Sequence, residues 1–205
     1  MRKLIVTEWV SLDGVVQSPA YADEDRSGGF AHGGWHLPYF GEASMRWVVD
    51  NVTKAGGFLL GRRTYDVFAA HWPNAPEAEQ MLAQPMNALP KFVASRTLKE
   101  PLAWQNSTLL NGDLAAHVAA LKREDGKYLL AIGSTELVQS LITNDLVDEF
   151  RLMIDPVVLG GGKRVFRDDG VLRRFRLTSS EATPTGAILA TYAHEKSEYG
   201  NSNAR

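Results

Sequence analysis

The chain has 205 residues, which suits a single domain, and its 44% hydrophobic and 22% charged residues are ordinary for a globular protein. A formal net charge of −2 gives none of the basic excess that is typical of nucleic-acid binding. The absence of cysteine excludes disulfides, thiolate nucleophiles and cysteine-based metal sites.

The apolar runs bear on the protein's location. The first of them, Leu4–Val6, is far too short for the core of a signal peptide, and Glu8 interrupts it. No apolar run approaches the ~20 residues of a membrane-spanning helix. We therefore expect a cytoplasmic protein that forms one domain over residues 1–195, followed by a flexible polar tail at 196–205.

The first quarter of the chain contains a strand, a long irregular segment and a helix. β-branched residues predict a strand over Lys3–Trp9, and Asp13-Gly14 then signals a turn. Residues Ser18–Gly41 hold five glycines and two prolines, which predict a loop, and several aromatic residues, which argue against disorder. Apolar residues spaced i, i+3, i+4, i+7 predict an amphipathic helix over Glu42–Lys54.

Strands and helices alternate through the rest of the chain. Strands are predicted over Gly57–Gly61, Lys91–Ser95, Ser107–Leu110, Lys127–Ile132, Val147–Ile154, Arg174–Ser180 and Ala187–His194. Helices are predicted over Thr64–His71, Ala78–Met86 and Ser134–Thr143, and from Asp113, as the cap, to Arg123. This order predicts an α/β fold with a mainly parallel central sheet, flanking helices and antiparallel strands at one edge.

Three turns that follow predicted strands carry residues suited to phosphate. They are Gly61, Arg62, Arg63 and Thr64; Ser95, Arg96 and Thr97; and Gly133, Ser134 and Thr135. If their strands are parallel neighbours, the turns meet at one edge of the sheet, where ligands of such folds bind. Two of the turns open a helix, whose free N–H groups favour anions. Three arginines carry more positive charge than a pyrophosphate needs, which suits a dinucleotide with a further ribose phosphate. Each turn taken alone is equally compatible with a surface turn or a helix cap.

Other patterns are weaker. Gly160–Arg164 lacks the first glycine and the Ser or Thr of a P-loop, so it is either a flexible turn or a place where the backbone approaches a ligand. His32 and His36 stand four residues apart near acidic residues, but in a loop rather than on a helix face, so we expect no metal site. No Gly-x-Ser-x-Gly hydrolase motif is present.

Four stretches together resemble the dihydrofolate reductase-like superfamily: TEWVSLDGVV, LLGRRTYDVF, KFVASRTL and LLAIGSTELVQSLITNDLVDEFRLMIDPVVLGGGKRVF. The resemblance covers about residues 2–194 and is to the branch related to the reductase domain of bacterial riboflavin biosynthesis. It implies a mostly parallel sheet with an antiparallel edge, NADPH as cofactor, hydride transfer from the nicotinamide and often a homodimer.

The resemblance also assigns roles to the three turns. It implies that Gly61–Thr64 hold the cofactor's phosphates, that Ser95 and Arg96 lie near the adenosine ribose phosphate, and that Gly133–Thr135 form the pyrophosphate turn. The sequence departs from the family pattern at Ser134, where paired glycines are common.

The candidate catalytic residues are two carboxylates. True dihydrofolate reductases carry a carboxylate on the first helix that engages the pterin ring. Here Glu42 is displaced from that register and Asp50 lies too far along the helix, which argues against folate as substrate. Asp13, at the rim where the nicotinamide should lie, is our first candidate for the acid and Glu42 the second, although Asp13 is equally suited to a structural role in the turn before Gly14.

These residues predict an NADPH-dependent reductase of a small heterocyclic or carbonyl-type substrate. The insertion at about 18–41 is expected to form a lid that shapes the substrate site, with Trp35 and His36 as candidate substrate contacts. Two alternatives stay open: the phosphoribosylaminouracil reductase of riboflavin biosynthesis, and a module that senses NADPH without catalysis. A proton donor at the nicotinamide end would separate an enzyme from a sensor.

Overall fold

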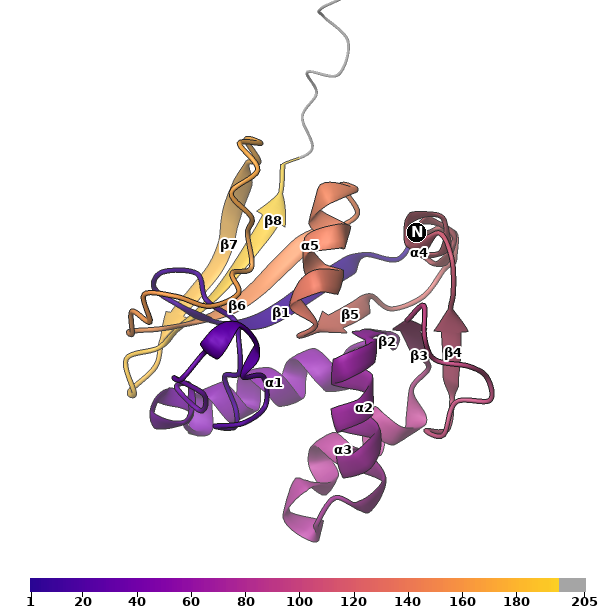
Figure 1. Ribbon diagram of the computed structural model, residues 1–205, viewed down its shortest axis with the longest axis horizontal. Helices are drawn as coiled ribbons and strands as arrows, with labels where there is room; N and C mark the ends of the chain where they lie inside the picture. Colours follow the sequence, from indigo (N-terminus) through magenta and orange to yellow (C-terminus); the bar gives the residue numbers. More distant parts are fainter. Residues whose placement is uncertain (196–205) are drawn as a thin grey trace, which may run out of the picture.

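A computed structural model describes residues 1–195, so the tail at 196–205, predicted to be flexible, lies outside the described residues. Within residues 1–195 an eight-stranded sheet forms the centre of the molecule, in the order β4-β3-β2-β5-β1-β6-β8-β7 (Figure 1). The strands are β1 Leu4–Ser11, β2 Gly57–Gly61, β3 Lys91–Ala94, β4 Ser107–Leu110, β5 Leu129–Ile132, β6 Glu149–Asp155, β7 Phe175–Ala182 and β8 Ile188–His194.

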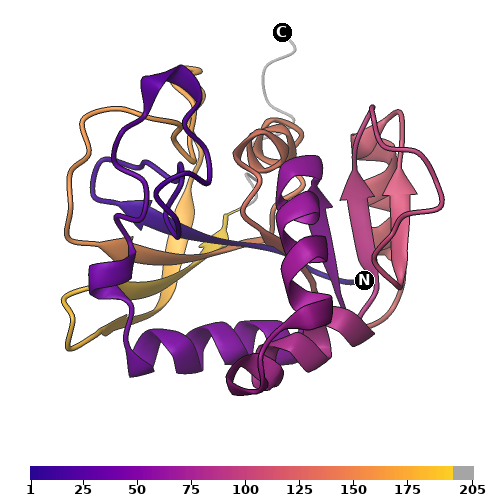
Figure 2. The same ribbon diagram turned by 60° about the horizontal axis from the view of Figure 1, so that its bottom comes forward.

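The strands from β4 to β6 all pair in parallel, whereas β8 and β7 add an antiparallel hairpin at one edge. This arrangement confirms the predicted fold class. Helices α1 (Glu42–Thr53), α2 (Arg62–His71) and α3 (Gln80–Ala88) lie on one face of the sheet, and α4 (Leu114–Arg123) and α5 (Thr135–Thr143) lie on the other (Figures 1 and 2). Short 3₁₀ turns occupy Ser27–Gly29, Leu37–Tyr39, Trp72–Asn74 and Glu77–Glu79.

Two apolar cores explain why the central strands are continuous apolar runs. Alternate residues of a strand point to opposite faces of the sheet. Val6 and Leu59 therefore pack with Val138 against α4 and α5, while Ile5 and Leu60 pack toward α1, α2 and α3. Because helices cover both faces, every residue of β2 is buried.

One boundary matters for function. Helix α2 begins at Arg62, two residues earlier than predicted, because Gly61 is extended (φ −79°, ψ 163°) and acts as the N-cap. Both Arg62 and Arg63 therefore lie in the first turn of the helix, directly after the end of β2. No helix among residues 1–195 is long and apolar enough to cross a lipid bilayer.

Candidate functional site

A cleft of about 1180 Å³ opens at the carboxyl ends of β1, β2, β3 and β5. All residues of the three predicted phosphate turns except Thr97 line it. The turns meet there because β3, β2 and β5 are adjacent parallel strands, so their carboxyl ends share one edge of the sheet. The convergence expected from the sequence is thus present in the structure.

Ser134 joins two of these turns. Its hydroxyl accepts a hydrogen bond from the backbone N–H of Gly61 (2.8 Å) and donates one to Oγ1 of Thr64 (2.6 Å). Gly133 and Ser134 both have left-handed backbones, with φ of +57° and +65°. This conformation is uncommon for a side chain with a Cβ atom, and it lets the backbone turn sharply into α5.

The N-termini of α2 and α5 are open at the cleft. Neither Gly61 nor Ser134, the two N-caps, offers a side-chain oxygen to the first N–H groups of its helix. By contrast, Asp113 caps α4 by accepting from the N–H of Ala116 (3.1 Å). Unpaired N–H groups together with the helix dipole favour a bound anion, so α2 and α5 offer two anion positions where α4 offers none.

The three arginines differ in their partners. Arg62 is paired with Asp66 (3.0 Å) and Arg63 with Asp25 (3.4 Å). Arg96 has no ion pair with any residue from 1 to 195, and it follows Ser95, whose hydroxyl accepts from the N–H groups of Thr97 and Leu98 and so fixes the turn. Arg96 is therefore the arginine of this site whose charge is free to meet a phosphate.

The other end of the cleft lies over β1. Its lining there combines Trp9 and Glu8 of β1, Phe40, and lid residues such as Tyr21 and Glu24. Glu8 is 7% exposed. Burial, with a smaller contribution from the charge of Glu24, raises the pKa of Glu8 from 4.5 to about 8. A protonated carboxyl group thus lies at this end of the cleft at neutral pH.

Our sequence reasoning missed Glu8. The signal was present, because Glu8 occupies the same strand face as Leu4, Val6 and Val10, which are all buried. An acidic residue at the third position of an otherwise apolar strand face is unusual enough to suggest a functional role.

The two carboxylates expected to be catalytic lie outside the cleft lining. Asp13 accepts hydrogen bonds from Oγ of Ser11 (2.6 Å) and from the N–H groups of Leu159 (3.1 Å) and Gly160 (2.9 Å), and these bonds lower its pKa. Glu42 starts α1 with its side chain 89% exposed and paired with Arg46. Asp13 is thus held within its turn, and Glu42 is solvated at the start of α1, so neither carboxylate faces the cleft in this structure.

Trp35 and His36 also lie behind the cleft rather than in its lining. Trp35 donates through Nε1 to the carbonyl of Gln17 (2.8 Å). His36 stacks on Trp9 at 4.2 Å between ring centroids, and its Nδ1 lies 2.6 Å from Oδ2 of Asp155. Burial raises the pKa of Asp155, although its contact with His36 opposes the rise. These two residues hold the lid against the sheet, whereas Trp9, on which His36 stacks, is in the lining of the cleft.

A metal site is not supported by the arrangement of the histidines. His32 packs edge-on against Phe30, whereas His36 is occupied by Asp155. Across residues 1–195, no three His, Asp or Glu side chains come together in a way that could hold a metal ion.

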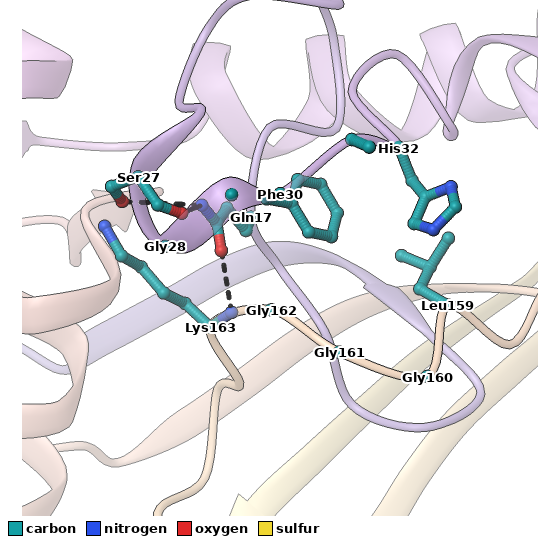
Figure 3. Close-up of a pocket in the computed structure, with 12 residues that line it drawn as sticks. Gln17, Ser27, Gly28, Phe30, His32, Leu159, Gly160, Gly161, Gly162 and Lys163 are labelled. Carbon is teal, nitrogen blue, oxygen red and sulfur yellow. Dashed lines mark hydrogen bonds between the residues drawn. The ribbon is translucent and has the colours of Figure 1, made fainter.

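A second cavity, of about 610 Å³, lies between the lid turn Ser27–Gly29 and the glycine loop at 160–162 (Figure 3). Gln17 spans the two walls, because its Nε2 donates to the carbonyl of Ser27 (2.9 Å) and its Oε1 accepts from the N–H of Lys163 (2.9 Å) (Figure 3). The ammonium of Lys163 is paired with Asp25 at 2.6 Å. Gln17 and Lys163 also line the main cleft, so the two cavities adjoin.

Residues 2–189 match the family model of the RibD C-terminal domain. The chain belongs to this family. It is 30% identical to the uncharacterized protein YyaP of Bacillus subtilis over 145 residues, which are 70% of this chain and 76% of YyaP.

Two solved structures show the same fold. A putative riboflavin biosynthesis protein from Shewanella sp. PV-4 superposes with a TM-score of 0.66 at 21% identity, covering 95% of this chain and 99% of that one. Dihydrofolate reductase from Enterococcus faecalis, complexed with NADP(H), superposes with a TM-score of 0.59 at 12% identity, covering 95% of this chain and 97% of the reductase. The dihydrofolate reductase-like fold expected from the sequence is confirmed.

Proposed function

We propose that this protein is an NADPH-dependent reductase that transfers a hydride to a small heterocyclic or carbonyl-type substrate. The observation that carries the proposal is the convergence of three turns, from three adjacent parallel strands, on one cleft. Membership of the RibD C-terminal domain family supports an oxidoreductase of this kind.

The residues of the cleft fit the cofactor. The open N-termini of α2 and α5 suit the two phosphates of a dinucleotide, because each presents unpaired N–H groups and the positive end of a helix dipole. The unpaired guanidinium of Arg96 suits the additional phosphate that distinguishes NADPH from NADH. Ser134 keeps the first and third turns at a fixed separation, so the diphosphate site is formed before the ligand arrives.

The protein's part in the reaction is to position the reactants and exclude water. Bound NADPH supplies two electrons and one hydrogen to an electrophilic carbon of the substrate. Trp9, Phe40, Met45 and Val48 form an apolar wall at the β1 end of the cleft. Such a wall suits a flat, largely uncharged substrate and keeps solvent from the reacting carbon.

The phosphoribosylaminouracil reductase activity finds less support in the site. That substrate carries its own phosphate and needs a cation to bind it. The second cavity adjoins the reactive end of the cleft, but the ammonium group in its lining, on Lys163, is paired with Asp25 at 2.6 Å. We therefore favour a substrate without a phosphate.

Cofactor selectivity tests the proposal. Trp9 and Trp72 line the cleft, so quenching of tryptophan fluorescence reports binding of NADPH and NADH. We expect Arg96→Ala to weaken NADPH by roughly 10- to 100-fold, since a charge-assisted hydrogen bond is worth about 1.5–3 kcal/mol, and to leave NADH nearly unchanged. Arg123→Ala, at the exposed C-terminal end of α4, is the matched control.

Three results would contradict this reading in different ways. Equal losses for the two cofactors would mean that Arg96 does not contact the ribose phosphate. No binding of NADPH by the unaltered protein would refute the proposed function. Binding without oxidation of NADPH in the presence of pterins, pyrimidines and carbonyl compounds would favour the sensor.

We also propose that the protein acts in the cytoplasm as a homodimer. Strand β7 is a sheet edge whose residues are exposed along almost its whole length. Two exposed apolar residues lie on this hairpin, Leu177 on β7 and Ile188 at the other end of β8, 49% and 43% exposed, next to backbone groups at the sheet edge. Such an edge is suited to a second copy of the chain.

A further inference from the structure

Glu8 is an unusual residue for a central strand. It lies on β1 between β5 and β6, is 7% exposed, and lines the main cleft. Its Oε1 is enclosed without a hydrogen-bond partner, and no other hydrogen bond joins its side chain to residues 1–195. A buried carboxyl group with no partner is costly to keep unless it serves a ligand.

The position of Glu8 relative to the phosphate turns is set by the sheet, and this step rests on the proposed function. Adjacent strands lie ~4.8 Å apart, so the turns after β3, β2 and β5 span about 10 Å. Strand β1 is the next strand beyond β5. A dinucleotide whose phosphates occupy those turns therefore extends its nicotinamide over β1, at the end of the cleft that Glu8 lines.

The charged groups around Glu8 do not neutralise a carboxylate there. Glu24 of the lid is close enough to raise the pKa of Glu8 by its charge. The other charged groups of the neighbouring elements already have partners or are acidic: they are Asp25 with Lys163 and Arg63, Arg151 with Glu149, and Glu136 at the start of α5. The neutral, protonated form of Glu8 is therefore favoured by burial and by its surroundings.

We propose that Glu8 is the acid of this site: it carries a proton at the nicotinamide end of the cleft and gives it to the substrate during reduction. When the substrate carbon of a C=N or C=O bond accepts two electrons and a hydrogen from the dihydronicotinamide, the π pair moves onto the nitrogen or oxygen. That atom takes the proton from the carboxyl of Glu8, the oxidised nicotinamide is left behind, and Glu8 recovers a proton from solvent. The substrate class is thus a neutral compound with an imine or carbonyl group.

The redox state of the cofactor provides a test that needs no substrate. The nicotinamide ring is positively charged in NADP⁺ and neutral in NADPH, while the phosphates of the two are the same. If Glu8 lies beside the ring, NADP⁺ favours its carboxylate, so by linkage the affinity for NADP⁺ rises with pH relative to NADPH. We expect the ratio of the two dissociation constants to change on the order of tenfold between about pH 7 and pH 9.5.

Two variants, each checked for folding by its melting curve, separate Glu8 from its neighbours. In Glu8→Gln the ratio should no longer depend on pH, while the affinity for NADPH at neutral pH stays unchanged. In Glu24→Gln the ratio of the dissociation constants should change by the same factor but at lower pH, because removal of the negative charge beside Glu8 lowers the pKa of Glu8. Glu8→Gln should also reduce NADPH oxidation with the best imine or carbonyl compound by at least about 100-fold.

The outcomes distinguish this inference from the proposed function. Absence of binding by either cofactor refutes the function itself. Suppose that both cofactors bind but the ratio of their dissociation constants does not depend on pH in the unaltered protein, or still depends on pH in Glu8→Gln. Either result overturns the role of Glu8 and leaves the proposed function standing. Undiminished turnover by Glu8→Gln overturns proton delivery in particular.

Discussion

The contact between Gly61 and Ser134 offers a sharp test of how the cofactor cleft is built. A Cβ atom on Gly61 would lie 2.8 Å from both Cβ and Oγ of Ser134, closer than nonbonded atoms approach in proteins. The backbone of Gly61 is itself acceptable for alanine, with φ −79° and ψ 163°. Gly61→Ala therefore introduces a steric clash between the first and third turns without introducing backbone strain.

The magnitudes follow from these distances. Overpacking of this kind costs about 1–3 kcal/mol, against a gain of about 0.4–1 kcal/mol from the lower entropy of the unfolded alanine variant. We expect Gly61→Ala to lose roughly 1–2 kcal/mol in the free energy of unfolding. Ser134→Gly gives up the bond from Gly61 N–H, about 1 kcal/mol, but relieves a left-handed serine by a similar amount, so it should be nearly neutral.

The double variant is the decisive measurement. Gly61→Ala with Ser134→Gly removes both atoms that the new methyl group meets, so stability should recover and the two effects should not add. Urea unfolding gives the free energies, and tryptophan fluorescence gives the NADPH affinity, which we expect to fall about tenfold in Gly61→Ala alone. Gly161→Ala is the matched control, because its new Cβ meets no atom within 4 Å. Additive effects, or a Gly61→Ala variant as stable as this control, would refute the reasoning.

Two further predictions concern stability and assembly. Because the pKa of Glu8 is raised to about 8, the folded protein holds that proton more tightly than the unfolded chain does. The stability that this contributes is complete below about pH 4.5 and is lost as the pH rises to about 8. Over that range the free energy of unfolding should fall by at most about 1.4 kcal/mol per pH unit. Glu8→Gln should flatten this dependence in urea unfolding at a series of pH values, and an unchanged slope would mean that Glu8 is ionised at neutral pH. For the dimer, Leu177→Lys should shift the sedimentation coefficient toward that of a monomer. Met81→Lys, at an exposed apolar position on α3, is the control and should leave sedimentation unchanged. If the unaltered protein sediments as a monomer, the proposed dimer is wrong.

The fold could be predicted because its central strands are buried on both faces. GFLLG and LLAI are apolar runs that fit such a strand, and each lies next to amphipathic helices. The ends were less accurate where pairing depends on neighbours. The strand predicted from Lys127 begins at Leu129, the first residue that pairs with both Leu4 of β1 and Gly57 of β2.

The phosphate turns were predictable for the same reason, since each follows an apolar run and the adjacency of β3, β2 and β5 places them together. The surroundings of the candidate acids were harder to predict. The contacts that hold Asp13 in its turn come from Leu159 and Gly160, almost 150 residues away in the chain. Glu8 was overlooked because an acidic residue in a strand is usually read as a solvent-facing position, which a sheet covered on both faces does not offer.

Hydrogen bonds hold the lid in one position against the sheet, and this affects substrate selectivity. Trp35 is bonded to the carbonyl of Gln17, and His36 is buried against Asp155 at the end of β6. Because His36 stacks on Trp9, the same contacts that hold the lid also set the orientation of the indole that lines the cleft. A change at Asp155 should therefore alter which substrates fit before it alters how tightly the phosphate turns hold NADPH, since within residues 1–195 no residue of those turns is hydrogen-bonded to His36 or Asp155.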